Sequence, residues 1–225
     1  MRLSFSFLAL LLFCNVEVVS NSKAHEKVCA VNWENGKLYI FKGNEYYRFD
    51  VAKDHADEGY PKLINEQTWP GIPFRSFDAV IVWNNGKAYF FRGSEYVRFD
   101  IAANRADAGY PKKIFGPNWK GVPFERIDAV VGWGNGKVYF FHGTEYVRYD
   151  VASDSADGPV KSIVGNWRGV PWEHFDSIIN YGNGKAYIIH GDEYVRFDVT
   201  NSHVDEGYPK LFEHGWKGVR FSNAP

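Results

Sequence analysis

The sequence is poor in excess charge of either sign, in cysteine and in long apolar runs. It has 26 Lys and Arg against 27 Asp and Glu, and no block of basic residues. A chain without a basic patch is poorly suited to nucleic acid or an anionic membrane surface, so we expect neither partner. The sequence also lacks a nucleophile elbow, a phosphate-binding loop, a dinucleotide fingerprint and a zinc-protease helix. These absences favour a binding protein over an enzyme.

The most apolar stretch lies at the N-terminus, where residues 8–13 follow the basic Arg2 and give way to Glu17. A basic start and a short apolar core are typical of a secretory signal peptide, and the stretch is too short to span a membrane comfortably. We predict a signal peptide over residues 1–20, with cleavage possible as late as residue 24. The protein is therefore expected to be secreted, without stable membrane insertion after cleavage.

The two cysteines are Cys14 and Cys29, and removal of the signal peptide would leave Cys29 alone. A lone thiol in a secreted protein can pair between chains. We favour instead a buried, inert thiol, because free cysteine often behaves as a small apolar residue. We expect a monomer or a weak dimer.

One phrase of sixteen residues dominates what the sequence does contain. NGKVYFFHGTEYVRYD at 135–150 recurs with small changes at 35–50, 85–100 and 183–198, in steps of 50, 50 and 48. A fixed period of this length indicates a repeat architecture, in which each unit needs its neighbours to bury its apolar face. Within the phrase, aromatic and β-branched residues alternate with polar ones across a short Gly-containing turn, which predicts a β-hairpin.

Each unit extends beyond its hairpin. In the last three units another apolar run, such as FDAVIVW at 77–83, precedes the hairpin and is joined to it by an Asn-Gly turn. A GYPK-type segment and a Trp-x-Gly motif follow, and proline suits the edge of a sheet. Four such sheets set radially make an all-β, four-bladed β-propeller. The predicted domain covers residues 26–225, with blades at about 26–76, 77–126, 127–174 and 175–225.

These motifs in this order resemble the hemopexin repeat. The pattern is F-D-A, then N-G-K-x-Y-x-F-x-G-x-x-Y-x-R-F/Y-D, then G-Y-P-K, then W-x-G-x-P. The resemblance covers roughly residues 26–225 and implies the propeller of heme carriers, matrix metalloproteinases, vitronectin and certain plant seed albumins. Vertebrate members tie the first blade to the last with a disulfide. The fourth unit here has no cysteine, so we expect the ring to close by packing and hydrogen bonds.

The resemblance also implies a cation, often calcium, held at one mouth of the central channel by main-chain carbonyls. Converging carbonyl oxygens suit a hard cation. The implied metal residues are Asp78, Asp128, Asp176 and, in the first blade, Cys29. Residues two positions further on, Val31, Val80, Val130 and Ile178, are implied to line the channel, where sodium and chloride could also bind.

The first blade leaves two alignments open. Counting back from Gly36 without a gap places Val28 opposite Asp78, whereas a one-residue deletion places Cys29 there. Members of the family often have asparagine at this position of the first blade, and a carbonyl ligand does not depend on its side chain. We favour Cys29 for the fourth corner.

The remaining polar residues favour structural roles. All four units carry an Arg-Phe/Tyr-Asp triplet, and a feature present in every repeat indicates a structural function. The histidines break the symmetry, but surface positions are their default interpretation. The heme site of the heme carriers lies between two propellers, and this chain has one.

Two hypotheses on function follow. The first is a secreted, non-enzymatic binding protein with a channel cation, which engages heme, a polyamine or an extracellular protein. The second is a storage or extracellular interaction protein whose metal is only structural. An asymmetric pocket with aromatic and acidic residues would favour the first, and the sequence shows none clearly. Fold alone does not choose between them.

Overall fold

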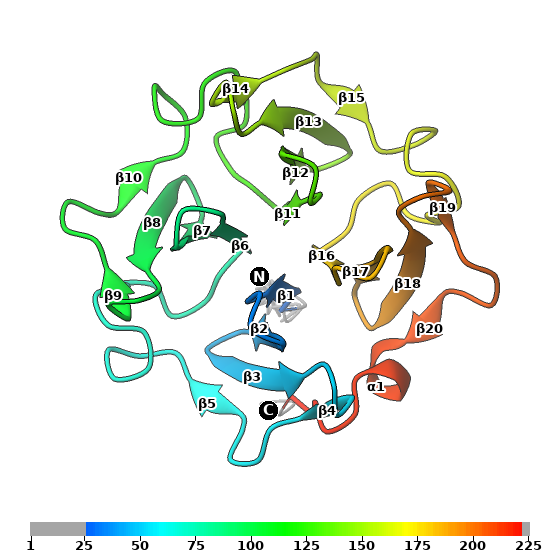
Figure 1. The fold of residues 1–225 in the computed structure, drawn as a ribbon, viewed down its shortest axis with the longest axis horizontal. Coiled ribbons are helices and arrows are strands. Elements are labelled where there is room, and N and C mark those ends of the chain that lie inside the picture. The colour runs from blue at the N-terminus through cyan, green and yellow to red at the C-terminus, as the bar shows by residue number, and fades with distance from the viewer. Residues whose placement is uncertain (1–25, 222–225) are drawn as a thin grey trace, which may run out of the picture.

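The computed structural model describes residues 26–221, and its architecture is four sheets arranged around a central axis (Figure 1). Each sheet has five strands, and a single one-turn helix, α1 (Phe212–Gly215), occurs in the described part of the chain. The predicted all-β, four-bladed propeller is confirmed. The predicted signal peptide lies outside the described residues.

Three long antiparallel strands form the inner part of each blade, and the first of them lines the axis. In blade one these are β1 (Val28–Asn32), β2 (Lys37–Lys42) and β3 (Glu45–Asp50). In blade two they are β6 (Ala79–Trp83), β7 (Lys87–Arg92) and β8 (Glu95–Asp100). In blade three they are β11 (Ala129–Gly132), β12 (Lys137–His142) and β13 (Glu145–Asp150). In blade four they are β16 (Ser177–Asn180), β17 (Lys185–His190) and β18 (Glu193–Asp198).

The outer segment of each blade is two short strands that pair with opposite ends of the same inner strand. In blade one, Ala56 pairs with Phe49 and Lys62 pairs with Tyr46. The short strands are β4 (His55–Ala56), β5 (Lys62–Leu63), β9 (Arg105–Ala106), β10 (Lys112–Lys113), β14 (Ser155–Ala156), β15 (Lys161–Ser162), β19 (His203–Val204) and β20 (Lys210–Leu211). The GYPK prolines of blades one, two and four lie just before the second short outer strand, which is β5, β10 or β20. At this edge of the sheet no backbone N–H is needed for strand pairing.

Tight Asn-Gly turns connect the first two inner strands of each blade. The second residue of such a turn needs a positive φ, which glycine adopts without strain. Gly36 has a φ of +79°, a region that L side chains rarely adopt. The amide oxygen of Asn35 accepts a hydrogen bond of 3.2 Å from the Lys37 backbone N–H, and Asn85, Asn135 and Asn183 repeat that contact.

Each blade packs on the next through a buried tryptophan. Trp69, which ends the first repeat, lies 5.2 Å from Phe90 and 5.6 Å from Phe99 of blade two between ring centroids. The same step carries a backbone hydrogen bond of 2.9 Å from Ala106 N–H to the Pro70 carbonyl. Trp119, Trp167 and Trp216 continue the pattern around the ring.

The ring closes where the last segment of the chain lies on blade one. Trp216 packs 5.5 Å from Phe49, and the Tyr47 hydroxyl donates to the Arg220 carbonyl at 2.7 Å. Inside the ring, Ser177 Oγ of blade four accepts a hydrogen bond of 2.9 Å from Ala30 N–H of blade one. Cys29 is a free, buried cysteine. Packing and hydrogen bonds therefore join the first and last blades in the described structure.

Candidate functional site

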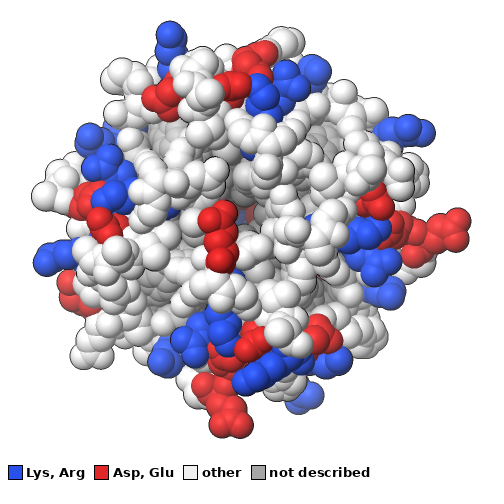
Figure 2. Space-filling model, in the orientation of Figure 1, with Lys and Arg blue, Asp and Glu red and all other residues white. Residues whose placement is uncertain are grey.

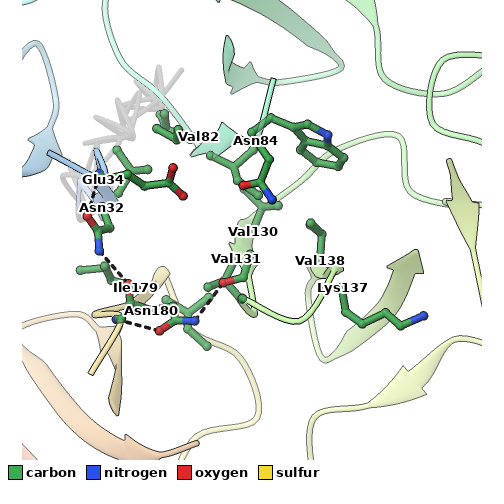
Figure 3. Close-up of a pocket in the computed structure, with 18 of the residues that line it drawn as sticks. Asn32, Glu34, Val82, Asn84, Val130, Val131, Lys137, Val138, Ile179 and Asn180 are labelled. Atoms are coloured by element: carbon green, nitrogen blue, oxygen red, sulfur yellow. Dashed lines mark hydrogen bonds between the residues drawn. The ribbon is translucent and has the colours of Figure 1, made fainter. Parts of the chain in front are cut away.

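A cavity of about 230 Å³ occupies the central channel and opens where the four innermost strands end. Its lining comes from all four blades and combines valine and isoleucine side chains with the polar residues Asn32, Glu34, Asn84, Lys137 and Asn180. The channel residues named from the sequence, Val31, Val80, Val130 and Ile178, are among those that line it. Figure 3 shows these inner strands converging on the open space. The cavity is thus lined mostly by apolar side chains, with polar groups where the inner strands end.

The polar mouth is not four-fold symmetric. Asn32 donates from Nδ2 to the Asn180 carbonyl at 3.1 Å, and Asn180 donates from Nδ2 to the Gly132 carbonyl at 3.2 Å. Strand pairing puts Val82 at the equivalent place in blade two. One position of the repeat is therefore occupied by a different residue type in different blades: Asn32, Val82, Gly132 and Asn180.

Glu34 supplies a carboxylate to this mouth. It lies in the turn after β1, has a φ of +61° and is anchored by its backbone N–H, which donates to Asn32 Oδ1 at 2.9 Å. Figure 3 shows its side chain directed into the opening, whereas Lys137 points away from it. Trp83 also lines the cavity. The mouth thus carries a carboxylate, and the sequence did not reveal it because Glu34 lies in a turn, outside the periodic pattern of the strands.

Lysine and arginine are interspersed with aspartate and glutamate around the rim of this face, and one acidic patch lies close to its centre (Figure 2). Lys137 is not free to neutralise the mouth, because its ammonium binds the carboxylates of Asp150 and Asp157. An organic cation would therefore meet a negative group at the opening and apolar walls below it.

The predicted metal residues lie at the opposite end of the channel, where the inner strands begin. The carboxylates of Asp78, Asp128 and Asp176 turn back onto their own hairpins and accept hydrogen bonds from the backbone N–H groups of Gly93, Gly143 and Gly191. The Asp78 side chain is only 2% exposed and pairs with Arg92 at 2.7 Å. These carboxylates thus brace the blades.

One carbonyl of the predicted ring already has a donor. Lys27 Nζ donates to the Asp128 carbonyl at 3.0 Å and lies 3.6 Å from Asp128 Oδ1. Burial would raise the pKa of Asp128, but the Gly143 N–H and the charges of Lys27, His142 and Arg126 outweigh it and lower that pKa. A metal ion on this carbonyl would meet the Lys27 ammonium, so the residues present do not fit the expected four-carbonyl cation site.

The strand register also decides which residue of blade one corresponds to Asp78. Cys29 pairs with Phe41 as Ala79 pairs with Phe91, so Val28 and not Cys29 stands at the place of Asp78. By the same register Ala30 corresponds to Val80, although Val31 still lines the cavity. The ungapped alignment is the one that the structure adopts, because β1 keeps the full ladder with β2. The choice of Cys29 for that corner was wrong in register.

The Arg-Phe/Tyr-Asp triplets form one ion-pair cluster per blade. In blade one, Lys37 contacts Asp50 at 2.8 Å and Asp57 at 2.9 Å, while Arg48 Nε contacts Asp57 at 2.5 Å. The clusters recur in the other three blades. Their repetition agrees with the structural role predicted from the sequence.

Among the described histidines, His174 and His190 contact each other, whereas His142 lies beside Asp128. His142 pairs with Asp128 at 3.0 Å, while His190 lies 4.9 Å from His174 and 5.2 Å from Trp172 between ring centroids. Across residues 26–221 no group of three or more His, Cys, Asp or Glu side chains is placed to hold a metal ion. Within those same residues no helix has the length and apolarity to cross a membrane.

A family model described as Hemopexin matches the chain four times, at residues 30–73, 77–123, 127–171 and 175–220. The chain belongs to the hemopexin family. Two curated relatives are mouse matrix metalloproteinase-25, 40% identical over 58 residues, and human matrix metalloproteinase-21, 49% identical over 47 residues. These matches cover 25% and 18% of this chain but only 9% and 8% of the relatives. The chain therefore spans a small part of the length of either proteinase.

Solved structures similar to this hemopexin-family chain include plant proteins. A plant lectin with two metal binding sites from Cicer arietinum has a TM-score of 0.71 and 26% identity, over 84% of this chain and 95% of the lectin. A plant albumin from Cicer arietinum showing hemagglutination has a TM-score of 0.71 and 24% identity, over 84% and 95%. A hemopexin fold protein from cow pea has a TM-score of 0.67 and 22% identity, over 86% and 96%. The last two show the fold alone.

Proposed function

We propose that this chain is a secreted, non-enzymatic binding protein that takes a small organic cation of the polyamine class at the open mouth of its channel. The observation that carries the proposal is the Glu34 carboxylate directed into a cavity with apolar walls and an amide rim. An ammonium group pairs with a carboxylate, and a methylene chain suits an apolar tube. The lectin neighbour, with its two metal binding sites, supports a binding role in general.

Among the cargoes named from the sequence, the lining chemistry favours a polyamine over heme. The cavity-lining residues include no histidine, cysteine or methionine, the side chains that most often hold heme iron. The narrow volume of about 230 Å³ likewise suits a slender chain better than a flat macrocycle. Calcium is not assigned to this mouth, because Glu34 is the one carboxylate among the residues that line the cavity.

Equilibrium dialysis or calorimetry with spermine tests the proposal. Wild-type protein should bind one spermine per chain, and Glu34→Gln should weaken binding roughly three- to tenfold, the worth of one exposed charge pair of about 1 kcal/mol. Glu213→Gln is the matched control, since this exposed glutamate lies away from the channel mouth. Hemin and calcium serve as competing ligands.

Equal binding by wild type and Glu34→Gln would remove Glu34 from the site. Absence of spermine binding would overturn the proposal and leave the storage or extracellular interaction hypothesis in its place. Binding that disappears between about 50 and 200 mM salt in both variants would indicate attraction by surface charge alone.

A further inference from the structure

Lys27 spans the channel from blade one to blade three at the end opposite to Glu34. The innermost strands β1 and β11 each pack against β6 and β16, which makes them opposite members of the ring of four. Figure 1 shows the same arrangement, with β1 and β11 facing each other across the axis. A hydrogen bond of 3.0 Å from Lys27 Nζ to the Asp128 carbonyl joins these opposite blades. The lysine side chain must therefore cross the channel.

We propose that the Lys27 ammonium is the resident cation of this end of the channel. It stands where the family resemblance implies a metal ion, on a carbonyl of the expected ring. Because it is covalently attached, it is present at every calcium concentration. It thus ties blade one to the opposite blade without a disulfide and without an added ion.

The geometry sets the ammonium and a metal ion in competition. Calcium binds carbonyl oxygens at about 2.3–2.6 Å, and the same oxygen already accepts the Lys27 hydrogen bond at 3.0 Å. Two cations held on one oxygen repel each other strongly where water is scarce. The Lys27 side chain is 21% exposed and that of Asp128 is 24% exposed, so solvent screens them only in part.

Two of the three carboxylates at this end, those of Asp78 and Asp128, already have cationic partners. Asp78 pairs with Arg92 at 2.7 Å and with Arg126 at 3.5 Å. Asp128 lies 3.4 Å from Arg126 and 3.6 Å from Lys27. The charges of these two carboxylates are thus already paired while Lys27 is in place, and the Asp176 carboxylate accepts the Gly191 N–H. Removal of the ammonium would free one carbonyl and one carboxylate, and both are oxygen ligands that calcium prefers.

The test compares thermal midpoints with and without calcium at constant ionic strength, held with tetramethylammonium chloride. In the presence of a chelator, Lys27→Met should melt roughly 2–8 °C below wild type, because the partly buried Asp128 carbonyl loses its donor. Calcium at a hundredfold excess over its dissociation constant should raise the variant by roughly 5–10 °C and wild type by less than about 1 °C. Equilibrium dialysis should show one added calcium per chain in the variant.

Two matched variants complete the experiment. Lys27→Arg keeps the positive charge, so its calcium response should stay as small as that of wild type. Lys120→Met removes an exposed lysine. It should change neither the thermal midpoint in chelator nor the shift caused by calcium. Spermine binding at the Glu34 mouth should be the same in all four proteins, which separates this proposal from the proposed function.

Three outcomes would overturn the proposal. One is a wild-type protein that calcium stabilises as much as it stabilises Lys27→Met. Another is a Lys27→Met protein that matches wild type in chelator and in calcium. The third is a Lys27→Arg protein that gains the calcium response of Lys27→Met.

Discussion

Lys37 and Asp57, twenty residues apart, form an ion pair of 2.9 Å that fastens the outer loop of blade one to its inner hairpin. Arg48 binds the same carboxylate from the next strand at 2.5 Å. Burial would raise the pKa of Asp57, but the hydrogen bonds from Lys37 and Arg48 outweigh it and lower that pKa. Hydrogen bonds from Lys37 and from the Lys53 backbone N–H lower the pKa of Asp50 to about 2.

These lowered pKa values predict acid unfolding in a defined window. A carboxyl whose pKa is lower in the folded state adds stability above its unfolded pKa of about 3.9, and this stability is lost as the pH falls through the folded pKa. The thermal midpoint should therefore stay level from about pH 8 to 5 and fall between about pH 4 and 2. Circular dichroism melts across this range measure it, and a level midpoint down to pH 2 would contradict the prediction.

Replacement of Asp57 should weaken blade one. Asp57→Asn removes the charge that both Lys37 and Arg48 bind, at a cost of about 1.5–3 kcal/mol, or roughly 3–12 °C in midpoint at neutral pH. Glu58→Gln is the control, because it changes the neighbouring exposed carboxylate. Thermal melts of both variants decide the matter, and equal midpoints would show that the cluster adds no stability.

Ser177 should matter for ring closure. Its Oγ accepts the buried Ala30 N–H at 2.9 Å, and the equivalent residues Ala79 and Ala129 have no such group. Ser177→Ala leaves that N–H without its partner and should cost about 1–3 kcal/mol of unfolding free energy. Urea unfolding followed by fluorescence measures the loss. Ser94→Ala, on an exposed turn, serves as the control. A Ser177→Ala protein as stable as this control would show that the hydrogen bond to Ala30 adds no stability.

The Cys29 thiol should be unreactive in the folded protein. Its side chain is buried, and desolvation raises its pKa to about 12, so the nucleophilic thiolate is scarce at neutral pH. In a Cys14→Ser background, a thiol reagent such as dithionitrobenzoate should modify no cysteine at pH 8 until guanidinium unfolds the chain. Rapid modification of native protein, or a disulfide-linked dimer on a non-reducing gel, would show that Cys29 is accessible.

Export should remove the apolar N-terminus. Protein collected from culture medium is expected to begin between Asn21 and Glu26, which leaves Lys27 in the mature chain. Intact mass spectrometry measures the new terminus. A soluble intracellular pool that retains residues 1–20 would count against a cleaved signal peptide.

The sequence by itself determined the repeat, the strands and the number of blades. Alternating aromatic and polar residues specify half-buried strands wherever they occur, and Asn-Gly pairs such as Asn85–Gly86 specify the turns between them. A fifty-residue unit with one apolar face must stack on its copies. The structural role of the Arg-Phe/Tyr-Asp triplets followed from the same repetition. Local patterns of this kind need no knowledge of distant contacts.

Only the tertiary structure decided what lies at the two ends of the channel. Lys27 and Asp128 are 101 residues apart and meet because the ring places their blades opposite each other. In the sequence Glu34 looks like any other turn residue. In the structure the first inner strand directs its side chain toward the axis. The place of Cys29 depended on one residue of register, which the ladder between β1 and β2 settles. Residues near the axis are brought together by closure of the ring, and no local pattern records that closure.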